Sequence, residues 1–195
     1  MRTRRALATA LATLVAIALT IPAVLAATEL AEDSFESQSY SGGSGWTSNW
    51  NEAGDDGSPS SGVIQVTSSG CSGRCLGFSA LLGVSGTYRI SRVTDIQGAT
   101  AATLSFRYQQ NGLGTLRVGT RSGPGDPWTE QTLSGGASGF QLHTMSVTPD
   151  ASGTTEIRFS LSSPLLLVVA ASAHVDDVEI TASYPTTTSS TTTSS

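Results

Sequence analysis

Short runs in which apolar and polar residues alternate make up most of the chain after residue 30. In the run ATLSFRYQQ, residues 102–110, Leu104, Phe106 and Tyr108 alternate with polar residues, as in a strand with one packed and one wet face. Similar runs are separated by turns rich in glycine, serine, asparagine and proline. They predict strands at residues 62–68, 75–80, 87–93, 102–110, 114–121, 128–133, 140–147, 155–161, 164–170 and 173–181.

This spacing predicts an all-β fold. Nine or ten antiparallel strands in two sheets, a jelly-roll type β-sandwich, account for the runs most economically. No segment after the N-terminal stretch shows a sustained helical apolar period. Residues 29–183 provide roughly 155 residues, enough for one domain with a real core but not for two comfortable ones.

Neither end of the chain is expected to belong to this domain. Residues 1–26 carry three arginines, then an apolar stretch and a small-residue site, the pattern of a cleaved secretory signal peptide that forms a helix. The alternative for this segment is a transmembrane anchor. Residues 184–195 are Ser/Thr-rich and predict a disordered or O-glycosylated stalk. The expected location is therefore secreted or cell-surface, with no membrane insertion of the mature chain.

Charge narrows the classes of partner. After the signal segment, seven arginines and no lysine stand against fifteen Asp and Glu, and this difference gives a formal net charge of −8. A surface of that sign does not suit nucleic acid or an anionic membrane.

The two cysteines lie in the short segment GCSGRC, residues 70–75. In a secreted chain, Cys71 and Cys75 are expected to close a small disulfide loop, with Gly73 easing the turn. Two free thiols are the alternative. The spacing does not fit a metal or redox motif.

The run HVDDVEI, residues 174–180, places two carboxylates inside an otherwise strand-like segment. Because side chains alternate across a strand, Asp176 is expected on the same inward face as Val178 and Ile180, with Asp177 pointing outward. An inward carboxylate needs a positive partner.

Two kinds of partner suit Asp176. One is an arginine, with Arg107 and Arg158 as candidates. The other is a calcium ion shared with Glu36, provided that the first and last strands lie side by side. In the segment that contains Glu36, Phe35 is expected to anchor the core from the first strand.

Three tryptophans are the candidates for a ligand surface. Trp46 and Trp50 lie four residues apart in a Gly/Ser-rich loop, a spacing that suits a sugar-stacking platform, and Trp128 lies in a turn. The alternative is that Trp46 and Trp50 fold back to cap the edge of the sandwich. The neighbouring segment NEAGDDG lacks the ligand spacing of a calcium loop and predicts a solvated turn.

Catalysis has little support in the sequence. No nucleophile-elbow motif occurs, and His174, although it lies near two acids, is expected to be an exposed strand residue. We therefore expect no enzymatic activity.

Several of these segments together resemble known secreted modules. They are DSFES at residues 33–37, GWTSNW at 45–50, GRCLGFSA at 73–80, ATLSFRYQ at 102–109 and HVDDVEI at 174–180. Over residues 32–183 the chain resembles MAM-type domains and carbohydrate-binding modules with a galactose-binding-like β-sandwich.

The resemblance implies a non-catalytic extracellular binding or adhesion module, with carbohydrate as its ligand class. It also implies a structural Ca²⁺ held by Glu36 and Asp176, although the apolar segment 162–173 departs from many relatives next to that site. The alternative function is a structural or protein-binding surface domain carried on the Ser/Thr-rich stalk.

Overall fold

The computed structural model describes residues 26–81, 85–134, 139–150, 154–164 and 170–185. These residues form eleven β-strands and no helix, so the described part of the chain contains no helix that could cross a membrane. Residues 1–25 of the expected signal peptide, residues 186–195 of the expected stalk and residues 165–169 of the expected strand 164–170 lie outside the described ranges.

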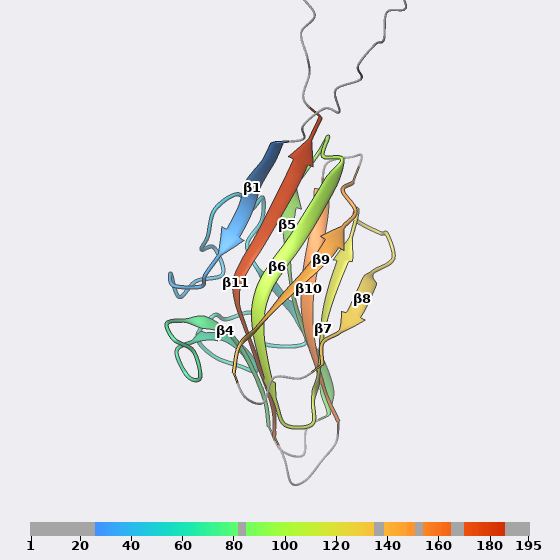
Figure 1. The fold of residues 1–195 in the computed structure, drawn as a ribbon. Coiled ribbons are helices and arrows are strands. Elements are labelled where there is room, and N and C mark those ends of the chain that lie inside the picture. Colours follow the sequence, from blue (N-terminus) through green and yellow to red (C-terminus); the bar gives the residue numbers. More distant parts are fainter. Residues whose placement is uncertain (1–25, 82–84, 135–138, 151–153, 165–169, 186–195) are drawn as a thin grey trace, which may run out of the picture.

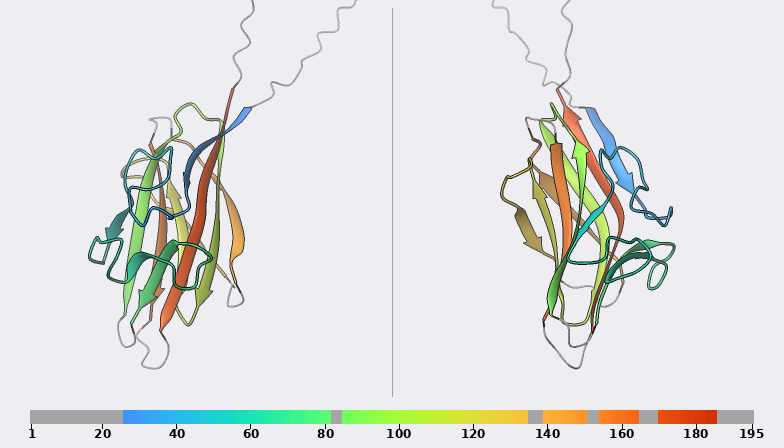
Figure 2. Two further views of the ribbon diagram at one scale, coloured as in Figure 1. Left: turned by 90° about the vertical axis from the view of Figure 1, so that its left-hand side faces the viewer. Right: turned by 180° about the vertical axis from the view of Figure 1, so that it is seen from behind.

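Two antiparallel sheets pack face to face, which confirms the predicted β-sandwich (Figure 1). Sheet A has the order β3-β4-β11-β6-β9, with β1 also paired to β11, and sheet B has the order β2-β5-β10-β7-β8 (Figure 2). The strands of sheet A are β1 (Ala26–Asp33), β3 (Ile64–Thr67), β4 (Cys75–Ala80), β6 (Ala101–Asn111), β9 (Gln141–Val147) and β11 (Ala171–Tyr184). Those of sheet B are β2 (Asn51–Ala53), β5 (Gly86–Asp95), β7 (Thr115–Arg121), β8 (Thr129–Thr132) and β10 (Thr154–Ser163).

The core lies between the two sheets and follows the alternation of the sequence. Leu104, Phe106 and Tyr108 of β6 are buried, while the residues between them are exposed or partly exposed. Phe106 meets Phe159 of β10 edge to face, with ring centroids 4.9 Å apart. This arrangement is favourable for aromatic pairs and joins the centres of the two sheets.

Phe35 is a core residue, as expected, but it does not lie on a strand. β1 ends at Asp33, and Phe35 follows in a left-handed conformation with a φ of 58° and no exposed surface. The Asp33 carboxylate accepts a hydrogen bond of 2.8 Å from the Phe35 amide, a local turn that directs the ring back into the core.

The expected inward position of Asp176 is wrong because β11 contains a bulge. Between the pairs Asp176–Arg107 and Glu179–Ser105, β11 has two residues where β6 has one, and Asp177 takes a φ of 48°. The extra residue shifts the alternation, so Val175 and Val178 both face the core. Asp176 therefore lies on the outer face of sheet A, where it is partly buried.

Candidate functional site

Trp50 is part of the hydrophobic core of the sandwich, and Trp46 is packed against that core. Trp50 is 3% exposed, and its indole nitrogen donates to the Asp33 carboxylate at 2.9 Å. Trp46 packs on Trp50 with a centroid distance of 5.6 Å and donates to the Glu32 carbonyl at 2.8 Å. The expected two-ring sugar platform is therefore wrong for Trp50, and the loop folds back onto the sandwich.

A buried ion pair explains why this loop folds inward. The Arg92 guanidinium donates to the Asp33 carboxylate at 2.5 Å, and the two side chains are 4% and 1% exposed. The guanidinium carbon also lies 4.8 Å from the Trp46 ring centroid and 5.6 Å from that of Trp50. Both rings thus pack against a buried cation, and Trp50 has no exposed face left for a ligand, whereas Trp46 is partly exposed and its role as a ligand residue stays a prediction.

β1 and β11 are neighbours, which meets the condition set for the Glu36–Asp176 pair, and the two carboxylates are near enough for the charge of Glu36 to act on Asp176. The pKa of Asp176 is raised from 3.8 to about 6, mainly by burial, and the charges of Asp177 and Glu36 contribute to this shift. Neither predicted arginine pairs with Asp176: Arg107 lies 3.8 Å from Asp177, and Arg158 lies on sheet B.

Glu36 and Asp176 each have one carboxylate oxygen bound to a backbone amide. One oxygen of Glu36 accepts from the Arg74 amide at 3.0 Å, and one oxygen of Asp176 accepts from the Asp177 amide at 2.9 Å. Within the described part of the chain, the second oxygen of each carboxylate has no hydrogen-bond partner. Two neighbouring carboxylates with free oxygens are ligands that Ca²⁺ prefers.

The predicted disulfide between Cys71 and Cys75 is present. Its loop lies over the outer face of sheet A, where Gly70 comes so close to His174 that an added Cβ would lie 3.1 Å from the imidazole. The loop also reaches Glu36, whose carboxylate would have to move to make room for a Cβ at Gly73. The disulfide thus holds a small flap beside the two carboxylates.

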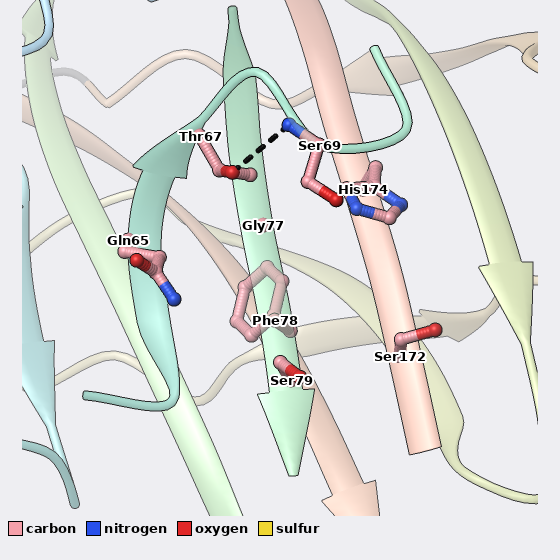
Figure 3. A pocket seen from close by; sticks show the side chains of 8 residues that line it. All are labelled: Gln65, Thr67, Ser69, Gly77, Phe78, Ser79, Ser172 and His174. Atoms are coloured by element: carbon pink, nitrogen blue, oxygen red, sulfur yellow. Dashed lines mark hydrogen bonds between the residues drawn. The ribbon is translucent and has the colours of Figure 1, made fainter. Parts of the chain in front are cut away.

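A polar pocket of about 320 Å³ opens beside this flap (Figure 3). Its lining comes from β3, β4, β11 and the flap, and consists of Gln65, Thr67, Ser69, Gly77, Phe78, Ser79, Ser172 and His174. His174 is partly buried, not exposed as predicted, and burial lowers the pKa of its imidazole. The only aromatic carbocycle in this lining, Phe78, belongs to the core, so the pocket offers hydrogen-bonding groups without an open ring face.

The outer face of sheet B presents a different surface, seen from outside in the right-hand view of Figure 2. Trp128 precedes β8, and its ring lies over Gly119 of β7, where an added Cβ would come 3.2 Å from the ring. The Arg158 guanidinium carbon lies 3.8 Å from the ring centroid, a stacked arrangement, and that of Arg121 lies at 4.8 Å. Trp128 remains partly exposed.

Two ion pairs fix the arginines around Trp128. Arg158 donates to Glu130 of β8 at 2.5 Å, and Arg121 donates to Glu156 of β10 at 2.6 Å. Each pair joins two strands of sheet B. The ring is thereby held by groups that have little freedom to move, which lowers the entropy lost when a ligand binds.

Hollows lie at both ends of this face. One, of about 240 Å³, lies between the turn at Gly123 and Pro124 and the β5 and β10 residues Val93 and Glu156. The other, of about 390 Å³, is lined by hydroxyl groups of Thr87, Thr115 and Ser162, among other residues. The sheet B face is therefore a strip of polar groups with one aromatic ring near its β8 edge.

Sequence reasoning missed the cluster of Trp128, Arg121 and Arg158 on this face. Trp128 was noted only as a turn residue, and Arg121 and Arg158 were not linked to it. All three become neighbours only through the pairing of β7 with β8 and with β10, which joins segments far apart in the sequence.

No protein-family model matches the sequence, and no curated protein matches it. Solved structures do match. The chain is 15% identical to TmCBM61, solved in complex with β-1,4-galactotriose, with a TM-score of 0.54; the match covers 75% of this chain and 92% of that one. It is 12% identical to the CBM22-1 xylan-binding domain from Paenibacillus barcinonensis Xyn10C, with a TM-score of 0.53, and covers 84% and 100% of the two chains.

A third match is a point mutant of a family 29 carbohydrate-binding module, with 12% identity, a TM-score of 0.50 and coverage of 83% and 94%. At these identities the likeness shows the fold. The described residues thus form the jelly-roll β-sandwich of carbohydrate-binding modules, as the sequence resemblance implied. The MAM-type part of that resemblance stays a prediction.

Proposed function

We propose that this chain is a secreted, non-catalytic carbohydrate-binding module whose glycan lies along the outer face of sheet B. The observation that carries the proposal is Trp128, a partly exposed ring held over Gly119 by two ion-paired arginines. Arg158 stacks on one side of the ring, so a sugar ring would pack on the part of Trp128 that remains exposed, while oriented polar groups hydrogen-bond its hydroxyls. The fold shared with carbohydrate-binding modules supports this ligand class.

A structural calcium ion belongs to the same proposal. Glu36 and Asp176 would hold it on the outside of sheet A, and it would neutralise two carboxylates that have no basic partner within hydrogen-bonding distance among the described residues. The ion would join the segment after β1 to the bulge of β11. Its contribution would be to stability and not to the glycan surface.

Polysaccharide binding by tryptophan variants tests the glycan site. We expect the purified domain to be retarded in affinity electrophoresis through at least one of a panel of gels that contain galactan, xylan or an acidic polysaccharide. Trp128→Ala should weaken that binding about tenfold or more, since it removes a stacking surface.

Trp46→Ala is the matched control because that ring packs in the Arg92 cluster. It should lower the melting temperature but leave glycan affinity unchanged. If Trp128→Ala binds as well as the wild type, or Trp46→Ala alone loses binding, the site is elsewhere.

A further inference from the structure

Four of the seven arginines in the described residues lie on the outer face of sheet B. The residues that flank them within their strands are buried, so the arginines themselves point away from the core. The four are Arg89, Arg117, Arg121 and Arg158. This concentration stands out on a chain whose formal net charge is −5.

Two of these arginines flank a serine in the middle of the sheet. Ser160 of β10 pairs with Arg89 on β5 and with Arg117 on β7. Because neighbouring strands lie about 4.8 Å apart, the Cα atoms of the two arginines are about 10 Å apart, with both side chains on the same side. Long side chains at that separation reach a group placed between them.

Among the described residues, these two arginines differ from the other two in having no ion pair with a carboxylate. Arg121 and Arg158 are paired with Glu156 and Glu130, respectively. In the described ranges, neither Arg89 nor Arg117 has a carboxylate partner. Arg117 donates only to a hydroxyl, that of Ser162, at 3.2 Å.

Arg117, one of the two sheet B arginines without an ion pair among the described residues, lies near the Trp128 ring. Trp128 covers Gly119, which is two residues beyond Arg117 on β7 and therefore about 7 Å along the strand. A guanidinium group presents donors in a planar fork that matches the two oxygens of a carboxylate. A chain of sugar rings on Trp128 would bring a substituent of the next ring to Arg117.

We propose that the glycan bound at this face is acidic, with an oxyanion held between Arg89 and Arg117 while a neighbouring sugar ring stacks on Trp128. This inference rests on the proposed function, because it names the chemical class of the ligand at the same site. The oxyanion is the carboxylate of a uronic acid or a sulfate ester, since both accept paired guanidinium hydrogen bonds.

Isothermal titration with matched polymers tests the proposal. The probes are polygalacturonate, its fully methyl-esterified form, dextran sulfate, dextran, galactan and xylan, each at low and at physiological ionic strength. We expect an acidic polymer to bind and its uncharged counterpart to bind about tenfold or more weakly. Salt should weaken the binding of the acidic polymer, because part of it comes from exposed charges. The polygalacturonate and dextran sulfate arms identify the oxyanion.

The protein variants are the double replacement Arg89→Gln with Arg117→Gln, and the control Arg74→Gln, which removes one charge in the disulfide loop beside sheet A. The double variant should lose affinity for the acidic polymer about tenfold or more, and Arg74→Gln should not. Replacing both residues with lysine keeps the charge but removes the fork, so affinity should be intermediate. A thermal melt confirms that each variant is folded.

Three results overturn the proposal, and they separate it from the proposed function. If galactan or xylan binds as tightly as the acidic polymers and Trp128→Ala abolishes that binding, the glycan site stands and its acidic specificity falls. If an acidic polymer binds but the double glutamine variant binds it equally well, the two arginines are not its site. If no polymer of the panel binds, both proposals fall together.

Discussion

Asp176→Asn should stabilise the protein when calcium is absent, although it removes a carboxylate from a candidate metal site. In the folded chain, burial is the main reason why the pKa of Asp176 is about 6 instead of 3.8, and the charges of Asp177 and Glu36 add to it. The folded state therefore holds the Asp176 proton more tightly than the unfolded state does. The free energy of unfolding must fall as the pH rises through the range from about 4 to about 6.

The size of this effect follows from the same values. A difference between 3.8 and about 6 corresponds to about 3 kcal/mol at neutral pH. Asp176 is only partly buried, and water screens its charge, so we expect about 1–2 kcal/mol. Asparagine keeps the shape of the side chain without the charge, so Asp176→Asn should recover about that amount above pH 6 and little below pH 4.

Urea unfolding in EDTA at a series of pH values measures the effect. Asp126→Asn, on an exposed turn, is the control and should follow the wild-type profile. Added Ca²⁺ should raise the stability of the wild type, because an ion that binds only the folded state stabilises it, and it should not stabilise Asp176→Asn. The reasoning is refuted if Asp176→Asn in EDTA is no more stable than the wild type at pH 7.

Three further predictions concern stability and are measured by urea unfolding. Arg92→Ala should lower the free energy of unfolding by about 3–5 kcal/mol, because it leaves the buried Asp33 carboxylate without its cation. A loss of less than about 1 kcal/mol would show that the pair is not buried in solution. Gly45→Ala should be far more destabilising than Gly98→Ala. Both glycines have a positive φ, but a Cβ on Gly45 would lie 1.5 Å from a backbone oxygen and one on Gly98 meets nothing, so equal losses would contradict the loop structure. Replacing both cysteines with serine should cost only about 2 kcal/mol, because the disulfide closes a short loop; complete unfolding would contradict this.

The strands were predictable because each has a clear alternation of its own. Of the ten segments expected from the alternation, nine coincide with described strands, and the three-residue β2 was not expected. β2 is too short to show a period. A first strand was expected around Phe35, but β1 ends at Asp33, and its start was hidden because its first residues follow the expected signal segment without a change in composition.

The site residues were harder to predict because their roles depend on contacts between distant segments. The parity argument for Asp176 failed at a bulge, which a run of seven residues does not reveal. That Glu36 and Asp176 lie near each other was predictable, because the pairing of the first and last strands brings them together. Trp50 looked like a ligand residue by type and spacing, but its indole nitrogen donates to Asp33, 17 residues earlier in the chain. Asp33 also accepts from Arg92, 59 residues away, so the role of Trp50 depends on contacts between distant segments.

Charge is divided between the two faces of the sandwich, and this division links the two proposed sites. Sheet A carries Glu36, Asp176 and a pocket of about 220 Å³ lined by Glu32, Asp177 and Glu179, among others, whereas sheet B carries the four arginines. An acidic glycan is therefore repelled by one face and attracted to the other. Packed sheets lie about 10 Å apart, beyond the Debye length of about 8 Å at physiological salt. Calcium on sheet A would thus stabilise the fold and change the field that a glycan meets on sheet B only weakly, so the two ligands should bind nearly independently.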